Sequence, residues 1–197
     1  AIVLLALVFV PGVGRRVNGA LRWISVGPIS FQPGEVAKLA VIVYLAHSLA
    51  KKRQRAALFS AGFVPHAIVT ALIASLILVQ PDLGTAAVIF AISGLMLFVA
   101  GTKIAYLVLA VVLAIPVGYH YVSTHAHAAA RLAAFADPEG NKLGIGYQIW
   151  ESLVAFGSGG PVGLGLGGGG EKLHFLPESH TDFVFAVVGR ELGFVGA

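Results

Sequence analysis

The stretch that decides the fold is residues 61–100, "AGFVPHAIVTALIASLILVQPDLGTAAVIFAISGLMLFVA", in which two long apolar runs are separated only by "QPD". A helix needs roughly 20 mainly apolar residues to cross the hydrocarbon core of a bilayer. Residues 61–79 and 83–100 each approach that length, and neither contains Lys, Arg, Asp or Glu. They therefore predict two membrane-spanning helices joined by a tight turn.

The same pattern recurs on both sides of this pair. Further spans are predicted at residues 1–10 (half of a span), at 31–50, at 104–121 and from Phe183 onward. Pro116 lies inside one of these runs and is expected to kink its helix, because proline cannot complete the helical hydrogen bond. Since the chain begins and ends within apolar runs, we expect it to be a fragment of a longer polytopic protein.

The composition supports this prediction. The chain is 57% hydrophobic and only 11% charged, with a mean hydropathy of +0.88, whereas a soluble domain carries about 25% charged residues. We therefore expect an all-α polytopic membrane bundle, with about five to six spans forming a single membrane domain fragment over residues 1–197. The net charge of +4 is too small and too scattered to indicate nucleic acid as a partner. The absence of cysteine excludes disulfides and thiolate metal sites.

The basic residues predict how the spans are oriented. The densest basic run, "KKRQR" at 51–55, favours the cytoplasm for its loop. Alternating crossings then place residues 80–82, the loop 11–30 and the long loop 122–181 outside. The loop 11–30 departs from the rule, because it also contains cations: Arg15, Arg16 and Arg22. These either touch lipid headgroups or serve an anionic ligand, and the sequence leaves both interpretations open.

The long extracytoplasmic loop 122–181 is expected to contain short elements. "AHAAARLAAF", residues 126–135, predicts a helix lying in the membrane interface with Arg131 on its polar side. "GYQIWESLVAFGSGG", residues 146–160, predicts a second short helix ended by glycines.

Nine of the fourteen residues at 157–170 are glycine, so no regular element is expected there. The tract contains Gly163-x-Gly165-x-x-Gly168, but no strand precedes this motif and no αβ unit surrounds it. We therefore reject a dinucleotide site and expect a flexible or tightly folded loop. A loop whose backbone closes over a ligand is the alternative.

Two groups of polar residues lie near the predicted outer ends of spans. Glu35 and Lys38 share one helix face at i and i+3, and Gln32 precedes them by one turn. Ionisable residues within a span usually face an interior cavity, so this pair is either a local ion pair or part of a ligand site. Asp82 directly precedes the run that starts at Leu83, where we expect it to cap the helix.

A third polar group lies in "EKLHFLPESHTDFVFAVVGRELG", residues 171–193, where Glu178, His180 and Asp182 lead directly into an apolar run. Apolar neighbours strengthen a carboxylate as a base, so Asp182 suits a general base acting on a hydroxyl. The alternative is that Thr181 and Asp182 merely cap the helix that follows, and the residues alone favour the cap. His120, His125 and His127 lack the spacing of a metal site and are expected to be interfacial.

Several blocks together carry a resemblance to a known family. "FQPGEVAKLA", "QPDLGTA", "RLAAFADP", "GYQ" and "FLPESHTDFVFAVVGRELGFVG" closely resemble motifs of the SEDS family (shape, elongation, division and sporulation), which includes FtsW and RodA. The blocks cover essentially the whole chain in the family's order. "VNGALRWISVGPISFQPGE" and "LVAFGSGG" are more similar to the FtsW branch.

The resemblance implies a bundle of roughly ten helices, of which this chain would cover the third to the start of the eighth. It implies a polymerase that joins lipid II into glycan strands at the outer face of the bacterial cytoplasmic membrane. The implied partners are a class B penicillin-binding protein and other division or elongation proteins.

By the same resemblance, Asp182 is the expected catalytic residue, and Glu35 and Lys38 line the central cavity. Arg131 matches the arginine that precedes the family's "FLDP" turn. Two positions depart from the family's pattern. Gly34 replaces a serine, and Arg190 replaces an acid that often precedes "ELG".

The resemblance also implies a mechanism in which Asp182 takes the proton of the acceptor sugar's 4-hydroxyl and the donor is inverted. The expected substrate-binding residues are Gln32, Glu35, Lys38, Arg22, Arg131, Glu178, His180 and Thr181. The sequence shows no protein-only metal site, although Mg²⁺ or Mn²⁺ could help to neutralise the leaving diphosphate. The alternatives are a lipid II flippase, since Glu35 and Lys38 would suit a translocation path through the membrane lipids, or a non-catalytic scaffold of the division machinery.

Overall fold

The computed structural model of the protein describes residues 1–17, 20–26, 29–51, 56–167 and 183–197. The chain divides into two compact units, Ala1–Val117 and Gly118–Ala197, and each is described by itself. The prediction that 1–197 forms one membrane domain concerns how these units associate, and it stays a prediction.

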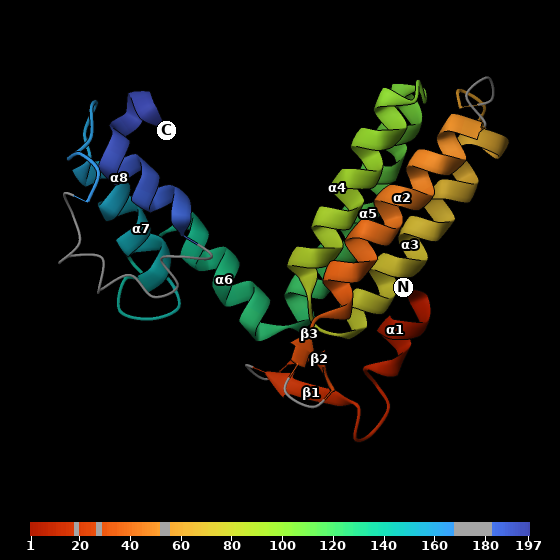
Figure 1. The fold of residues 1–197 in the computed structure, drawn as a ribbon, viewed down its shortest axis with the longest axis horizontal. Helices are drawn as coiled ribbons and strands as arrows, with labels where there is room; N and C mark the ends of the chain where they lie inside the picture. Colours follow the sequence, from red (N-terminus) through yellow and green to blue (C-terminus); the bar gives the residue numbers. More distant parts are fainter. Residues whose placement is uncertain (18–19, 27–28, 52–55, 168–182) are drawn as a thin grey trace. The chain divides into compact units, whose positions relative to one another are not determined.

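The first unit is a helical bundle. It contains α1 (Ile2–Leu7), α2 (Pro33–Lys51), the π-helical turn η2 (Phe59–Phe63) that continues into α3 (Val64–Val79), α4 (Leu83–Val99) and most of α5 (Ile104–Thr124). Helices α2, α3 and α4 pack against one another (Figure 1). Their buried residues recur four apart, as Ala37, Val41 and Leu45 do on α2, because residues at i and i+4 share one face of a helix.

Helices lie at all four full spans predicted in this part of the chain, and that each of the four crosses a membrane stays a prediction. The helix expected at 104–121 runs three residues further, to Thr124, and remains one helix through Pro116. The segments Phe59–Val79 and Ile104–Thr124 are long and apolar enough to cross a membrane, and α4 is equally apolar but shorter. Large apolar side chains such as Leu39, Leu72 and Leu95 are exposed, as expected of helices whose solvent is lipid.

The loop expected at 11–30 contains a small antiparallel sheet, which the all-α prediction did not include. Strands β1 (Gly14–Val17), β2 (Ala20–Val26) and β3 (Ile29–Phe31) pair in the order β1-β2-β3, and Ile24 lies opposite Phe31. Strand β3 is followed by Gln32 and then directly by α2. The sheet therefore lies at the end of the bundle where α2 begins (Figure 1).

Two hydrogen bonds show which residues lie at each end of this bundle. Gln32 and Asp82 are hydrogen-bonded at the end that carries the sheet, whereas the Thr102 hydroxyl donates to the carbonyl of Ala56 at the other end. The strands of the sheet, Gln32 and residues 80–82 therefore share one end, as the alternating crossings predicted. Which end faces the cytoplasm stays a prediction.

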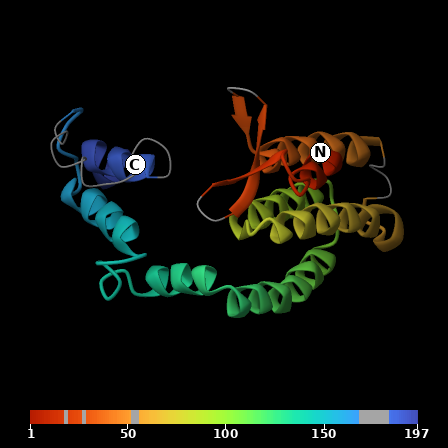
Figure 2. The ribbon, with the colours of Figure 1, turned by 90° about the horizontal axis from the view of Figure 1, so that it is seen from below.

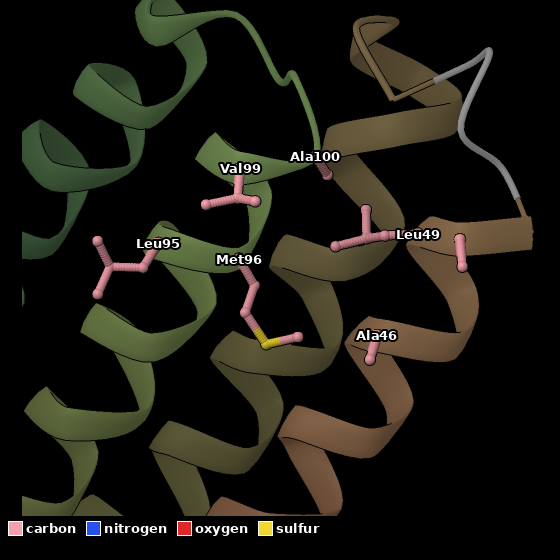
Figure 3. Close-up of a pocket in the computed structure, with 7 residues that line it drawn as sticks. Ala46, Leu49, Leu95, Met96, Val99 and Ala100 are labelled. Atoms are coloured by element: carbon pink, nitrogen blue, oxygen red, sulfur yellow. The ribbon is translucent and has the colours of Figure 1, made fainter.

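An apolar hollow of about 410 Å³ lies at the end remote from the sheet, between α2 and α4. Its lining residues are all apolar: Ala46, Leu49, Ala50, Leu95, Met96, Val99 and Ala100 (Figure 3). Because none of these side chains can donate or accept a proton, this hollow is not the candidate site.

The second unit contains the end of α5, then α6 (Ala126–Ala136), α7 (Tyr147–Ser158) and α8 (Val184–Gly196), which follow one another along the chain in Figure 2. Helices α6 and α7 confirm the two short helices predicted in the long loop, and α8 confirms the one expected near Phe183. Helices α7 and α8 pack together, with the rings of Phe156 and Phe185 5.7 Å apart.

The described part of the glycine tract, residues 157–167, is tightly folded against the end of α8. The backbone N–H groups of Leu164 and Gly165 donate to the carbonyls of Arg190 and Glu191, each at 3.0 Å. Gly193 interrupts α8 with φ 73° and ψ −177°, and the N–H groups of Phe194 and Val195 donate to Gly160 and Pro161. The carbonyls of Arg190 and Glu191 therefore lack their partners within the helix, and the tract satisfies both. A Cβ on Gly163 would lie 2.1 Å from the Glu191 carbonyl oxygen. Only glycine allows this approach, so residues 157–167 form a tightly folded loop, one of the predicted alternatives.

Candidate functional site

The candidate site of the first unit is built around Asp82. As predicted, Asp82 caps α4, because its Oδ1 accepts a hydrogen bond from the backbone N–H of Thr85 at 3.1 Å. Its Oδ2 accepts two more, from Thr85 Oγ1 at 2.9 Å and from Gln32 Nε2 at 2.8 Å. The carboxylate is nearly buried, with 11% of its side chain exposed. Asp82 therefore joins the start of α2 to the start of α4.

The sheet brings a cation to the same carboxylate. Arg22 lies on β2, and its Nη1 is 3.8 Å from Asp82 Oδ2. At this distance the pair is loose, and 28% of the Arg22 side chain remains exposed. A guanidinium has five N–H donors, so Arg22 keeps donors available for an anion while Asp82 holds it in place.

Close packing between α2 and α4 fixes the geometry of the cluster formed by Arg22, Gln32, Asp82 and Thr85, which we call the Asp82 cluster. Gly34 is buried beside it, and a Cβ at that position would lie 3.2 Å from Thr85 Cγ2. Serine at this position, which is usual in the SEDS family, would require Thr85 to move by a few tenths of an ångström. The glycine therefore lets the two helix starts approach slightly more closely.

Glu35 and Lys38 form the ion pair that their spacing predicted. Lys38 Nζ lies 2.8 Å from Glu35 Oε2. The side chain of Glu35 is 60% exposed and that of Lys38 is 27% exposed. The Gln32 amide, predicted to share their face, donates to Asp82 instead. The local ion pair is thus formed, and a role in ligand binding stays a prediction.

The other predicted site residues belong to the second part of the chain. Arg131 is exposed on α6. Glu178, His180, Thr181 and Asp182 lie outside the described residues, so the structure does not test the choice between a general base and a helix cap. Among the predicted histidines, His125 stacks on Tyr121 with ring centroids 4.1 Å apart.

Sequence reasoning assigned Asp82 to a cap and missed its second role as the residue that joins Arg22 and Gln32. The only signal that could have indicated this role is topological. Alternating spans place residues 22, 32 and 82 at the same membrane boundary, where an unpaired carboxylate beside an arginine would be unusual.

A bundle of apolar helices with a carboxylate–cation cluster at one end defines a polytopic membrane protein with a polar site at one end of its helices. Comparison with known proteins agrees with this class. The profile of the family described as "Cell cycle protein" (FtsW, RodA and SpoVE) matches residues 1–197. The chain therefore belongs to the FtsW/RodA/SpoVE family, that is, to the SEDS proteins.

Individual relatives extend this result. The "Probable peptidoglycan glycosyltransferase FtsW" of Trichlorobacter lovleyi is 44% identical over 196 residues, which are 100% of this chain and 51% of that protein. The protein of the same name from Saccharophagus degradans is 43% identical over 205 residues, covering 100% of this chain and 51% of that protein. The chain thus spans about half the length of these relatives.

Solved structures agree in fold. A chain from a structure described as "Structural coordination of polymerization and crosslinking by a peptidoglycan synthase complex" matches with a TM-score of 0.69 and 33% identity, covering 99% of this chain and 53% of that one. The rod shape determining protein RodA of Thermus thermophilus matches with a TM-score of 0.53 and 32% identity, covering 99% of this chain and 46% of that one. These matches confirm the polytopic helical fold and the predicted family.

Proposed function

We propose that the protein containing this chain is a peptidoglycan glycosyltransferase that polymerises lipid II into glycan strands at the outer face of the bacterial cytoplasmic membrane. The observation that carries the proposal is the match of the whole chain, at 44% identity, to a relative named as a probable peptidoglycan glycosyltransferase. The names of these relatives favour the FtsW branch and hence a role in cell division.

The proposed reaction forms one bond and breaks another at the same carbon. The 4-hydroxyl oxygen of the acceptor sugar attacks the anomeric carbon of the donor while Asp182 accepts the hydroxyl proton. The bond from that carbon to the diphosphate oxygen breaks, and undecaprenyl diphosphate leaves with the bonding electrons. One base and a single displacement invert the anomeric centre, as in inverting hydrolases.

Charge on the leaving diphosphate needs nearby cations. We assign this role to Lys38, Arg131 and Arg22, and the exposed, loosely paired guanidinium of Arg22 supports its inclusion. Gln32, Glu35, Glu178, His180 and Thr181 would contact the sugars and phosphates. A divalent cation such as Mg²⁺ or Mn²⁺ could help to neutralise the leaving diphosphate. Polymerisation rates measured with and without a chelator test this requirement for a metal.

We further propose that the protein works with a class B penicillin-binding protein, which would crosslink the new strands. The support is the structural likeness to a chain from a complex described as coordinating polymerisation and crosslinking. Both lipid-linked substrates are anchored in the membrane, so a site at its outer boundary would meet their headgroups.

The test uses the purified full-length parent in detergent with lipid II as its only substrate. A polymerase is expected to produce glycan strands, separated by length on a gel. A flippase or a scaffold would leave lipid II unchanged, because neither forms a glycosidic bond. Failure to make glycan, with lipid II translocation retained in vesicles, would replace the proposal with the flippase.

A further inference from the structure

Arg190 is the most deeply buried cation that the structure describes. It lies on α8, and only 5% of the residue is exposed. A guanidinium stays protonated in proteins, and arginine is almost never fully buried unless it is paired. A charge in this position therefore requires an anion close by.

The described residues do not supply that anion. The Nε of Arg190 is buried and has no hydrogen-bond partner, and the two ion pairs among described residues involve other cations. The neighbouring carboxylate of Glu191 accepts from the backbone N–H of Gly167 at 3.0 Å. The carbonyls of Arg190 and Glu191 are satisfied by the glycine tract. An unpartnered charged donor costs more than an ordinary lost hydrogen bond.

The chemistry of the guanidinium and of the residues near Arg190 in the sequence indicates the kind of ligand that would supply the missing anion. Nε and one Nη of a guanidinium form a fork that binds two oxygens of a carboxylate or phosphate. Exposed apolar side chains flank Arg190 in the sequence, namely Phe185 before it and Leu192, Phe194 and Val195 after it. A buried cation on a segment that also exposes apolar side chains suits a ligand with an anionic head and a hydrocarbon tail.

We propose that Arg190 is the cation of a binding site for the diphosphate of a prenyl-linked molecule, either the substrate or the released prenyl diphosphate. This inference rests on the proposed function, which supplies such a molecule. The proposal also assigns a function to Arg190 at a position where the family often has an acid before "ELG". The site belongs to the pairing of α7 with α8, where Gly159 lies directly against the backbone of Arg190.

The test measures binding of three probes to the full-length parent in phosphatidylcholine nanodiscs: farnesyl diphosphate, inorganic diphosphate and farnesol. Wild type is expected to bind farnesyl diphosphate more tightly than either other probe. Arg190→Gln should weaken the binding of farnesyl diphosphate about tenfold or more, because it loses a hydrogen-bonded charge pair. Arg190→Lys should bind farnesyl diphosphate with an affinity between those of wild type and Arg190→Gln, because lysine keeps the charge and loses the two-donor fork of the guanidinium.

Lys142→Gln is the matched control, since Lys142 is an exposed cation of the same unit, and it should bind all three probes as wild type does. Equal affinity of wild type and Arg190→Gln for farnesyl diphosphate would overturn the proposal. So would a wild type that binds farnesol as tightly as farnesyl diphosphate, a result that does not depend on any variant folding.

A lower melting temperature of Arg190→Gln with unchanged probe binding would instead assign Arg190 to a carboxylate of the protein. Asp182→Asn separates this inference from the proposed function. It should retain farnesyl diphosphate binding whether or not polymerisation depends on Asp182.

Discussion

Asp82 shows how one side chain can combine a local role with a long-range one. Its Oδ1 caps α4, while its Oδ2 receives the Gln32 amide from fifty positions away in the sequence. The cap was predictable because Asp directly precedes an apolar helical run. The contact with Gln32 was not, because it depends on α2 and α4 beginning at the same end of the bundle.

The Asp82 cluster can be tested by two substitutions of the same residue. Asp82→Ala removes the cap and the cross-link, and should lower the free energy of unfolding by about 2–3 kcal/mol. Asp82→Asn keeps a good capping oxygen and loses the charge, and should cost about 1 kcal/mol. Unfolding in detergent, followed by circular dichroism, measures both. Equal losses for the two variants would show that the charge, rather than the cap, matters.

Glu35 offers a different test, because its carboxylate is exposed and its partner Lys38 is partly exposed. Such pairs contribute about 0–1 kcal/mol, so Glu35→Gln should leave the melting temperature nearly unchanged. If Glu35 binds substrate, the same variant should slow polymerisation about tenfold or more. Unchanged activity of Glu35→Gln would leave the pair as a purely local contact.

At the scale of elements, the apolar runs predicted the helices well, whereas the strands were missed. Spans are set by length and hydropathy, which are local properties of the sequence. The sheet at 14–31 comes from short segments whose pairing is not local. A signal was present nonetheless, since Asn18-Gly19 separates two candidate strands and this dipeptide is typical of tight hairpins.

The fold of the glycine tract leads to a prediction that compares two glycines. Gly163 and Gly165 both have positive φ, of 80° and 86°, but a Cβ would meet the Glu191 carbonyl only at Gly163. Gly163→Ala should therefore destabilise α8 more than Gly165→Ala, which carries only the backbone strain of about 1 kcal/mol. Limited proteolysis of the parent would report local opening. Equal protection of the two variants would contradict the close contact.

At the scale of the whole molecule, successive helices end alternately at the two ends of the bundle. This alternation predicts that the end with the sheet lies outside the cell and the other end lies in the cytoplasm. Residues 1–197 contain no cysteine, so single cysteines can be placed here in a parent from which any other cysteine has been removed. Ser30→Cys, on strand β3 of the sheet, should react with a membrane-impermeant maleimide added to intact cells. Ala57→Cys, at the other end of the bundle, should react only after lysis. The reverse pattern would place the Asp82 cluster in the cytoplasm and exclude it from polymerisation outside.

The proposed mechanism depends most on Asp182, and one rate measurement tests the role of this residue directly. The full-length parent carrying Asp182→Asn should polymerise lipid II about 10²–10⁴ times more slowly than wild type, because an amide cannot accept the hydroxyl proton. Its melting temperature should stay close to that of wild type, and Glu139→Gln, which neutralises an exposed acid, should retain full activity. Polymerisation at the wild-type rate by a folded Asp182→Asn protein would contradict the assignment of the base.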